Sequence, residues 1–210
     1  MCRVCVTLNR ITGNQLNTFP HCVQVQQYLI IMKEQIADLF EDLEKKKGQI
    51  INTFDSMSEE QRRFKVNSDD WNSLQIVLHV VKAEQLSVGL MLRNFRRKNE
   101  LQKAGLGSKF RMFLLRMGLT LPLRFKAPKM VDVTGHTPEY EQLKNDWDKV
   151  RLNLKKLLDD CDEVTARKEL YTHPRAGKLN AKQALQFLNL HLSHHQKQLL
   201  RIVKHSKLVE

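Results

Sequence analysis

The segment that most constrains the fold is residues 180–205, in which apolar side chains recur at helical spacing without interruption. Asn180, followed three residues later by Gln183, is typical of a capping box at a helix N-terminus. At 3.6 residues per turn the stripe continues for about seven turns, far longer than a strand. The segment therefore predicts a long amphipathic helix with one buried face.

Three further segments have the same helical period. They are residues 23–54, residues 70–101 behind a cap at Ser68 or Asp69, and a helix opened by Thr137 with Pro138 in its first turn. Ser58 predicts a short helical turn between the first two. Only 8 Gly and 5 Pro occur among 210 residues, and alternating apolar runs are missing, which disfavours a sheet.

These patterns predict an all-α fold, an antiparallel four-helix bundle with a long crossover connection between helices two and three. A chain of this length fits one domain, which we place at residues 21–207 behind a flexible N-terminal arm, residues 1–20. The longest apolar run, residues 28–32, is far short of the roughly 20 residues of a membrane span. The N-terminus also lacks the apolar core of a secretory signal, so we expect a cytoplasmic protein with free cysteine thiols.

Three histidines fall on the apolar faces of the predicted helices. At about 100° per residue, His191 and His195 lie within the stripe of the last helix, and His79 lies with Ile76 and Ala83 on the second. A single buried histidine is ordinarily a core residue with both ring nitrogens hydrogen-bonded. Three together predict a metal site, because an i, i+4 pair and a third histidine from a facing helix supply three ligands and leave a fourth position open.

Two stretches carry a resemblance to a known family. WNSLQIVLHVVKAE at 71–84 and HPRAGKLNAKQALQFLNLHLSHHQKQLLRI at 173–202 resemble the DinB-like superfamily, the DinB/YfiT-like metalloenzymes. The resemblance covers residues 23–205 and implies a four-helix bundle, one divalent metal ion, and His79, His191 and His195 as its ligands. His194 matches the histidine often found beside the last ligand and is not expected to bind.

The resemblance also implies a chemistry. Relatives include thiol-dependent transferases, so zinc or nickel with a low-molecular-weight thiol, or a hydrolase reaction, is expected on a small-molecule substrate. Leu192 follows His191 where an HExxH protease has glutamate, which excludes that class. No residue identifies itself as the catalytic base. Further candidates around the metal or substrate are the polar residues Asn72, Gln75, Glu84, His173 and His194.

The connection between the second and third helices is strongly basic. Residues 93–131 contain eleven Lys and Arg against one acid, Glu100. Within it Phe110, Phe113, Leu114 and Met117 predict a short amphipathic helix that packs its apolar side across the bundle end. Alternatively the connection is a lid that guides an anionic substrate, with Arg111 and Arg116 as candidate contacts.

A second class of function stays open. A net charge of +12 permits a non-catalytic basic binding module for nucleic acid or an anionic membrane surface, with a structural or vestigial metal site, although no nucleic-acid motif is present. Neither partner is favoured over a small molecule, and the family makes a homodimer plausible. Cys2, Cys5, His21 and Cys22 could form a zinc knuckle, but no apolar residues are arranged to pack behind it, so a disordered tail is favoured.

Overall fold

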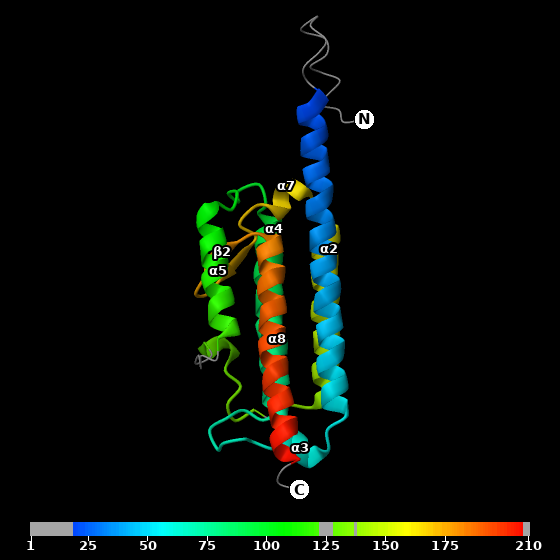
Figure 1. The fold of residues 1–210 in the computed structure, drawn as a ribbon, viewed down its shortest axis with the longest axis vertical. Helices are drawn as coiled ribbons and strands as arrows, with labels where there is room; N and C mark the ends of the chain where they lie inside the picture. Colours follow the sequence, from blue (N-terminus) through cyan, green and yellow to red (C-terminus); the bar gives the residue numbers. More distant parts are fainter. Residues whose placement is uncertain (1–18, 122–127, 137, 208–210) are drawn as a thin grey trace, which may run out of the picture. The chain divides into compact units, whose positions relative to one another are not determined.

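The structure is a computed structural model that describes residues 19–121, 128–136 and 138–207, with the side chains of residues 19–31 and of residue 106 left undescribed. The chain divides into two units, residues 1–34 and 35–210, and the architecture below is that of the second. The described helices and strands, in chain order (Figure 1), are α2 Phe19–Asp55, α3 Glu59–Arg63, α4 Ser73–Arg96, α5 Leu106–Thr120, the 3-10 helix η1 Lys129–Val131, α6 Tyr140–Asp159, α7 Glu163–Ala166, β1 Tyr171–His173, β2 Gly177–Leu179 and α8 Ala181–Ser206.

The fold is mostly helical, as the sequence predicts. Within the described residues, no helix has both the length and the apolar character needed to cross a membrane. The predicted N-terminal arm lies outside the described residues except for Phe19 and Pro20, which begin α2. The cysteines of the possible zinc knuckle also lie outside the described residues or side chains, and Cys161 is a free thiol.

Helix starts are set by side-chain caps. Asn180 and Gln183 form the predicted capping box of α8. The start predicted for the second helix is wrong by a few residues, because Asn72 rather than Ser68 or Asp69 caps α4. A capping residue must place its side-chain oxygen on a backbone N–H of the first turn, and Asn72 does so at the N–H of Gln75 (2.9 Å).

The third long helix also begins later than predicted. The first helical residue of α6 is Tyr140, and Glu139 occupies the cap position without a side-chain hydrogen bond, so Pro138 lies outside the helix. The proposed cap, Thr137, lies outside the described residues. The helical period predicted for this segment is present in α6, and Trp147 is fully buried on its apolar face.

The core is formed by the apolar faces of the long helices. α4 packs against both α6 and α8, and the part of α2 from residue 35 onward runs beside α8 (Figure 1). Polar contacts tie α2 to its neighbours: Asn189 of α8 donates to the Leu39 carbonyl (2.8 Å), and Lys47 pairs with Asp148 of α6. The largest fully buried side chains are Trp147, Phe54, Leu43, Ile50, Met91, Leu154, Leu157, Leu170, Leu179, Leu185, Leu188 and Leu192.

A two-stranded antiparallel sheet precedes α8, which the sequence did not predict. β1 and β2 pair from Tyr171 with Leu179 to His173 with Gly177. Gly177 has a φ of 69°, a backbone conformation that residues with a Cβ rarely adopt. The strands have three residues each, too short for an alternating pattern to be visible in the sequence.

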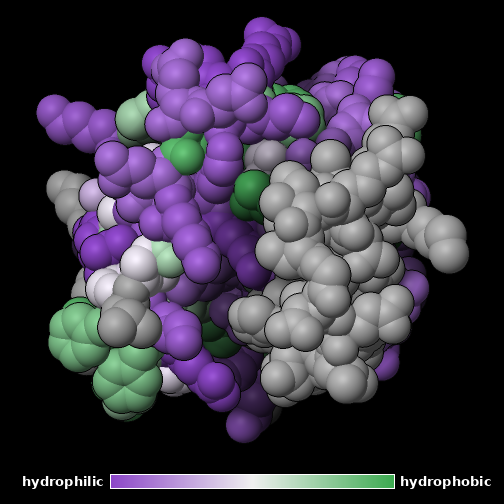
Figure 2. Space-filling view, turned by 90° about the horizontal axis from the view of Figure 1, so that it is seen from above, coloured by the Kyte–Doolittle hydropathy of each residue, from purple (hydrophilic) through white to green (hydrophobic). Residues whose placement is uncertain are grey.

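Helix α5 is present, but the prediction for its apolar side is wrong. Phe110, Phe113, Leu114 and Met117 are 63%, 57%, 51% and 41% exposed, so this stripe faces outward. The inward side carries Met112, and α5 packs against α8 and β2. The helix is apolar on both sides, so its sequence pattern did not determine which side is buried. Figure 2 shows aromatic side chains projecting from a surface that is otherwise mainly hydrophilic.

Candidate metal centre

Helices α4 and α8 bring three histidines into one cluster. Each of His79, His191 and His195 offers a ring nitrogen, and these nitrogens all lie within 4.8 Å of one another. The Nε2 atoms of His191 and His195 are 3.0 Å apart. Zinc–nitrogen bonds of about 2.0–2.1 Å at tetrahedral angles hold ligand nitrogens roughly 3.3 Å apart. His191 and His195 are therefore close to the spacing of metal ligands, whereas the widest separation in the cluster would have to shorten by up to about 1.5 Å for all three nitrogens to surround a metal ion.

Hydrogen bonds determine which nitrogens are available. The Nδ1 atom of His79 lies 2.8 Å from the Val131 carbonyl oxygen, and that of His195 lies 2.8 Å from Gln198 Oε1. An oxygen acceptor requires a proton on Nδ1, which leaves Nε2 with an unprotonated lone pair. Metal-binding histidines have this arrangement, with the other nitrogen donating to a carbonyl. The Nδ1 atom of His191 is buried and has no hydrogen-bond partner among the described residues.

The environment keeps the cluster uncharged. Burial lowers the pKa of His79, and the hydrogen bond to Val131 opposes that shift only in part. Burial lowers the pKa values of His191 and His195 well below the ordinary value, and repulsion from neighbouring histidines adds to the effect. The imidazoles are therefore neutral near pH 7, the form that binds metal. Three neutral imidazoles suit zinc or nickel, so this donor set could hold either ion.

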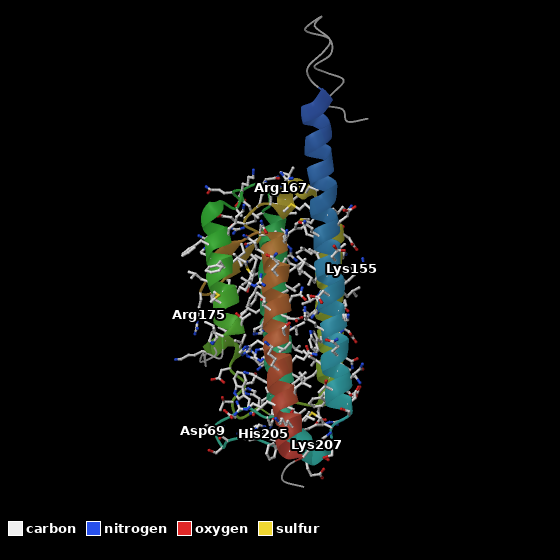
Figure 3. The ribbon with its side chains drawn as sticks, viewed as in Figure 1. Asp69, Lys155, Arg167, Arg175, His205 and Lys207 are labelled. Atoms are coloured by element: carbon white, nitrogen blue, oxygen red, sulfur yellow. The ribbon has the colours of Figure 1, made fainter. Side chains whose placement is uncertain are left out.

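The cluster borders a cavity of about 870 Å³. Its walls come from α4, α5, α8, residues 66–71, residues 128–134, and β1 with the turn after it, and they are mainly apolar. Three arginines and three aspartates also line it: Arg111, Arg175, Arg201, Asp69, Asp70 and Asp132. Asp69 and Arg175, labelled in Figure 3, both border the cavity and lie toward the α5 side of the molecule in that view. A cavity of this size with a few polar groups is typical of a small-molecule site.

His173 and His194, two of the predicted surrounding residues, line this cavity. The Nδ1 atom of His173 accepts the backbone N–H groups of Arg175 (3.2 Å) and Ala176 (2.9 Å). Its proton is therefore on Nε2. Burial, with a smaller effect from the positive charge of Arg175, lowers its pKa to about 4. His173 is thus a neutral hydrogen-bond donor at the cavity wall.

The other three predicted surrounding residues do not line the cavity. Asn72 and Gln75 form the capping box of α4. Glu84 is fully buried on the side of α4 that faces α6, where it accepts hydrogen bonds from Trp147 Nε1 and Arg151 Nη2, both 2.8 Å. Their contacts stabilise the helix and the core instead of the site.

The two lid candidates differ in position. Arg111 borders the cavity, and its Nη2 atom donates to the Lys178 carbonyl oxygen of β2 (2.9 Å). Arg116 is exposed and is not among the cavity residues. Gln198, which contacts His195, was not among the residues predicted from the sequence, although its position three residues after His195 on one helix places it within reach of that ring.

Taken together, the fold and cluster define a mostly helical protein with a three-histidine group that could bind a metal ion. The family model of the DinB superfamily matches residues 42–199. The chain belongs to the DinB superfamily, as the resemblance in its sequence indicated. No match was found among curated proteins or among solved structures.

Proposed function

We propose that this protein is a divalent-metal-dependent enzyme of the cytoplasm that acts on a small, anionic molecule as a thiol-dependent transferase or a hydrolase. The observation that carries the proposal is the histidine cluster: two of its three rings are hydrogen-bonded so that Nε2 is unprotonated, and all three border the cavity. The proposal includes an antiparallel four-helix bundle of α2, α4, α6 and α8, which places ligands from α4 and α8 face to face.

The metal and the protein have separate tasks in this proposal. Zinc or nickel would act as a Lewis acid and lower the pKa of a bound water or thiol. Arg111, Arg175 and Arg201 place guanidinium groups in the cavity wall, and each can pair with an anionic group of the substrate. Asp69, Asp70 and Asp132 also line the cavity and balance this charge, so the attraction comes from individual arginines and not from a net positive field. His173 can donate a hydrogen bond from Nε2 to an acceptor atom of the substrate, because its Nδ1 is already occupied. The apolar walls exclude water from the bound molecule.

Metal analysis tests the first half of this function. Protein purified without a histidine tag or chelator should contain about one zinc or nickel ion per chain. His79→Ala, His191→Ala and His195→Ala should each lose it. His205→Ala is the matched control, because His205 is half-buried near the end of α8, does not line the cavity, and its Nδ1 contacts the Arg201 carbonyl. A wild-type protein without metal, and without affinity for added zinc or nickel, would contradict the proposal.

The second half requires an activity screen. Metal-loaded protein is incubated with low-molecular-weight thiols and a chromogenic electrophile, or with chromogenic esters and amides without thiol. Turnover that His191→Ala abolishes and His205→Ala retains would support an enzyme and would separate transferase from hydrolase chemistry. Turnover unaffected by His191→Ala would count against the site.

A second function is favoured by the outer surface of α5. Its exposed stripe, which includes Phe110 and Phe113, is flanked by Lys109 and Arg116, and α5 carries no acidic residue. An anionic lipid surface fits this combination, because apolar side chains enter the interface while basic ones meet the headgroups. Duplex DNA would use only the charge.

Sedimentation with phosphatidylcholine vesicles, with and without phosphatidylserine, tests the alternative. Binding to the anionic vesicles that Phe113→Ser weakens would support it, with Leu152→Ser as control because Leu152 is 70% exposed on another helix. Binding to labelled duplex that falls steeply with salt would favour nucleic acid instead. Absence of both would remove the alternative.

A further inference from the structure

The side chain of Gln198 lies between two histidines. Its Oε1 atom is 2.8 Å from His195 Nδ1, and its Nε2 atom is 3.2 Å from His194 Nε2. The other ring nitrogen of His194, Nδ1, is 3.3 Å from the carbonyl oxygen of Leu119, the penultimate residue of α5. A continuous line of polar contacts thus runs from the backbone of α5 to one ring of the candidate metal centre.

When each ring carries a single proton, one arrangement of protons satisfies every contact in this line. The Leu119 carbonyl can only accept, so His194 carries its proton on Nδ1, and its Nε2 is then an acceptor. That nitrogen accepts from the amide NH2 of Gln198, which turns the amide oxygen toward His195. The oxygen accepts from His195 Nδ1–H, and His195 Nε2 is therefore unprotonated and faces His191 Nε2 within the cluster, 3.0 Å away.

The two rings with fixed tautomers are held in different ways. His79 donates to the backbone carbonyl of Val131, and a carbonyl oxygen can act only as an acceptor. His195 depends on a side-chain amide, which can present either its oxygen or its NH2 group. If the amide turned over, its NH2 would face Nδ1 of His195 and favour a proton on Nε2, which would then be unable to bind metal. Something must hold the amide, and His194 is placed to do so.

We infer that Gln198 and His194 are positioning residues that hold His195 in the tautomer that binds metal. This inference rests on the proposed function of the cluster. Gln198 makes the direct contact with the ligand, and His194, anchored on Leu119, selects the orientation of the amide. His194 therefore serves the centre without binding the metal.

Metal affinity provides the first test. Zinc and nickel dissociation constants are measured by competition with a chromogenic chelator, and far-ultraviolet circular dichroism checks the fold. Gln198→Met, which keeps the length but removes the acceptor, should weaken binding about 10–100-fold, the usual effect of losing the partner of a metal-bound histidine. Gln198→Glu keeps an oxygen acceptor for His195 and should retain affinity within a few-fold. His194→Leu should lie between the two, because the amide keeps its place but loses its orientation.

The matched control is Gln196→Met. Gln196 lies two residues away on α8, and its amide donates to Gln49 Oε1 (3.1 Å) instead of contacting a histidine. The Gln196→Met variant should bind metal with the affinity of the wild type. Equal affinity of Gln198→Met and Gln196→Met would overturn the inference. If Gln198→Met does not fold, the contrast between Gln198→Glu and His194→Leu decides: equal loss in both also overturns it.

The tautomer itself can be read without metal. Imidazole 15N chemical shifts of the metal-free protein should show His195 protonated on Nδ1 in the wild type and a mixed or reversed tautomer in His194→Leu. Wild-type His195 protonated on Nε2 would refute the inference even if metal binds. Conversely, the predicted tautomer in a wild-type protein without metal affinity would support the positioning role while the proposed function fails.

Discussion

The buried carboxylate of Glu84 allows a prediction that separates stability from function. Glu84 is fully buried and accepts hydrogen bonds from Trp147 and Arg151, whose side chain is 4% exposed. Among the described residues, Glu84→Ala would leave the guanidinium paired only with Glu44, at 3.2 Å, and the indole N–H without an acceptor. Removing one partner of a buried ion pair costs about 3–5 kcal/mol in the free energy of unfolding.

The second acid of this network supplies the control. Glu44 is 40% exposed, so solvent screens its contact with Arg151 and Glu44→Ala should cost less than about 1 kcal/mol. Burial raises the pKa of Glu84 above its ordinary value, with Arg151 and Trp147 opposing the shift. The carboxylate thus depends on those two neighbours for its charge, which is the reason that the two substitutions should differ.

Urea unfolding followed by circular dichroism measures both variants. A loss of about 3–5 kcal/mol corresponds to a lower melting temperature by roughly 6–20 °C for a chain of this size. Metal content of the folded Glu84→Ala protein should equal that of the wild type, since Glu84 contacts no residue of the histidine cluster in the structure. A stability change below 1 kcal/mol would refute the energetic argument. Loss of metal from a folded variant would refute the separation of Glu84 from the site.

Three further predictions follow from the cavity. Zinc at about 100 times its dissociation constant should stabilise the wild type by about 2.7 kcal/mol in a thermal melt, His205→Ala equally and His191→Ala not at all. The free energy of unfolding should fall as the pH decreases below about 6.5, because folding lowers the pKa of His173 and of the histidine cluster, and the unfolded chain then binds more protons. Each such histidine contributes up to about 1.4 kcal/mol per pH unit. His173→Phe should flatten this slope in urea titrations at pH 7.5 to 5, and an unchanged slope would contradict the lowered pKa. Arg111→Glu should weaken capture of anionic substrate analogues in calorimetry at low salt with metal retained, whereas equal weakening by Arg116→Glu would point to general surface charge.

The sequence by itself determined the features that depend on neighbours along one helix. The capping box of Asn180 and Gln183 joins residues three apart, and His191 and His195 share a face because they are four apart. Such contacts form wherever the segment is helical, so spacing alone predicts them. The inward position of His79 followed in the same way from the stripe that it shares with Ile76.

Only the tertiary structure decided the features that depend on partners far along the chain. The carbonyl that fixes the tautomer of His79 belongs to Val131, 52 residues away, and no spacing rule indicates it. Glu84 lies on the same helix as His79 but faces α6, where Trp147 and Arg151 bind it. The sequence of α5 has apolar residues on two sides of the helix, and α8 and β2 pack against one of these sides. Periodicity shows which residues share a face, but burial of that face depends on the segment that packs against it, and that choice is made by the whole chain.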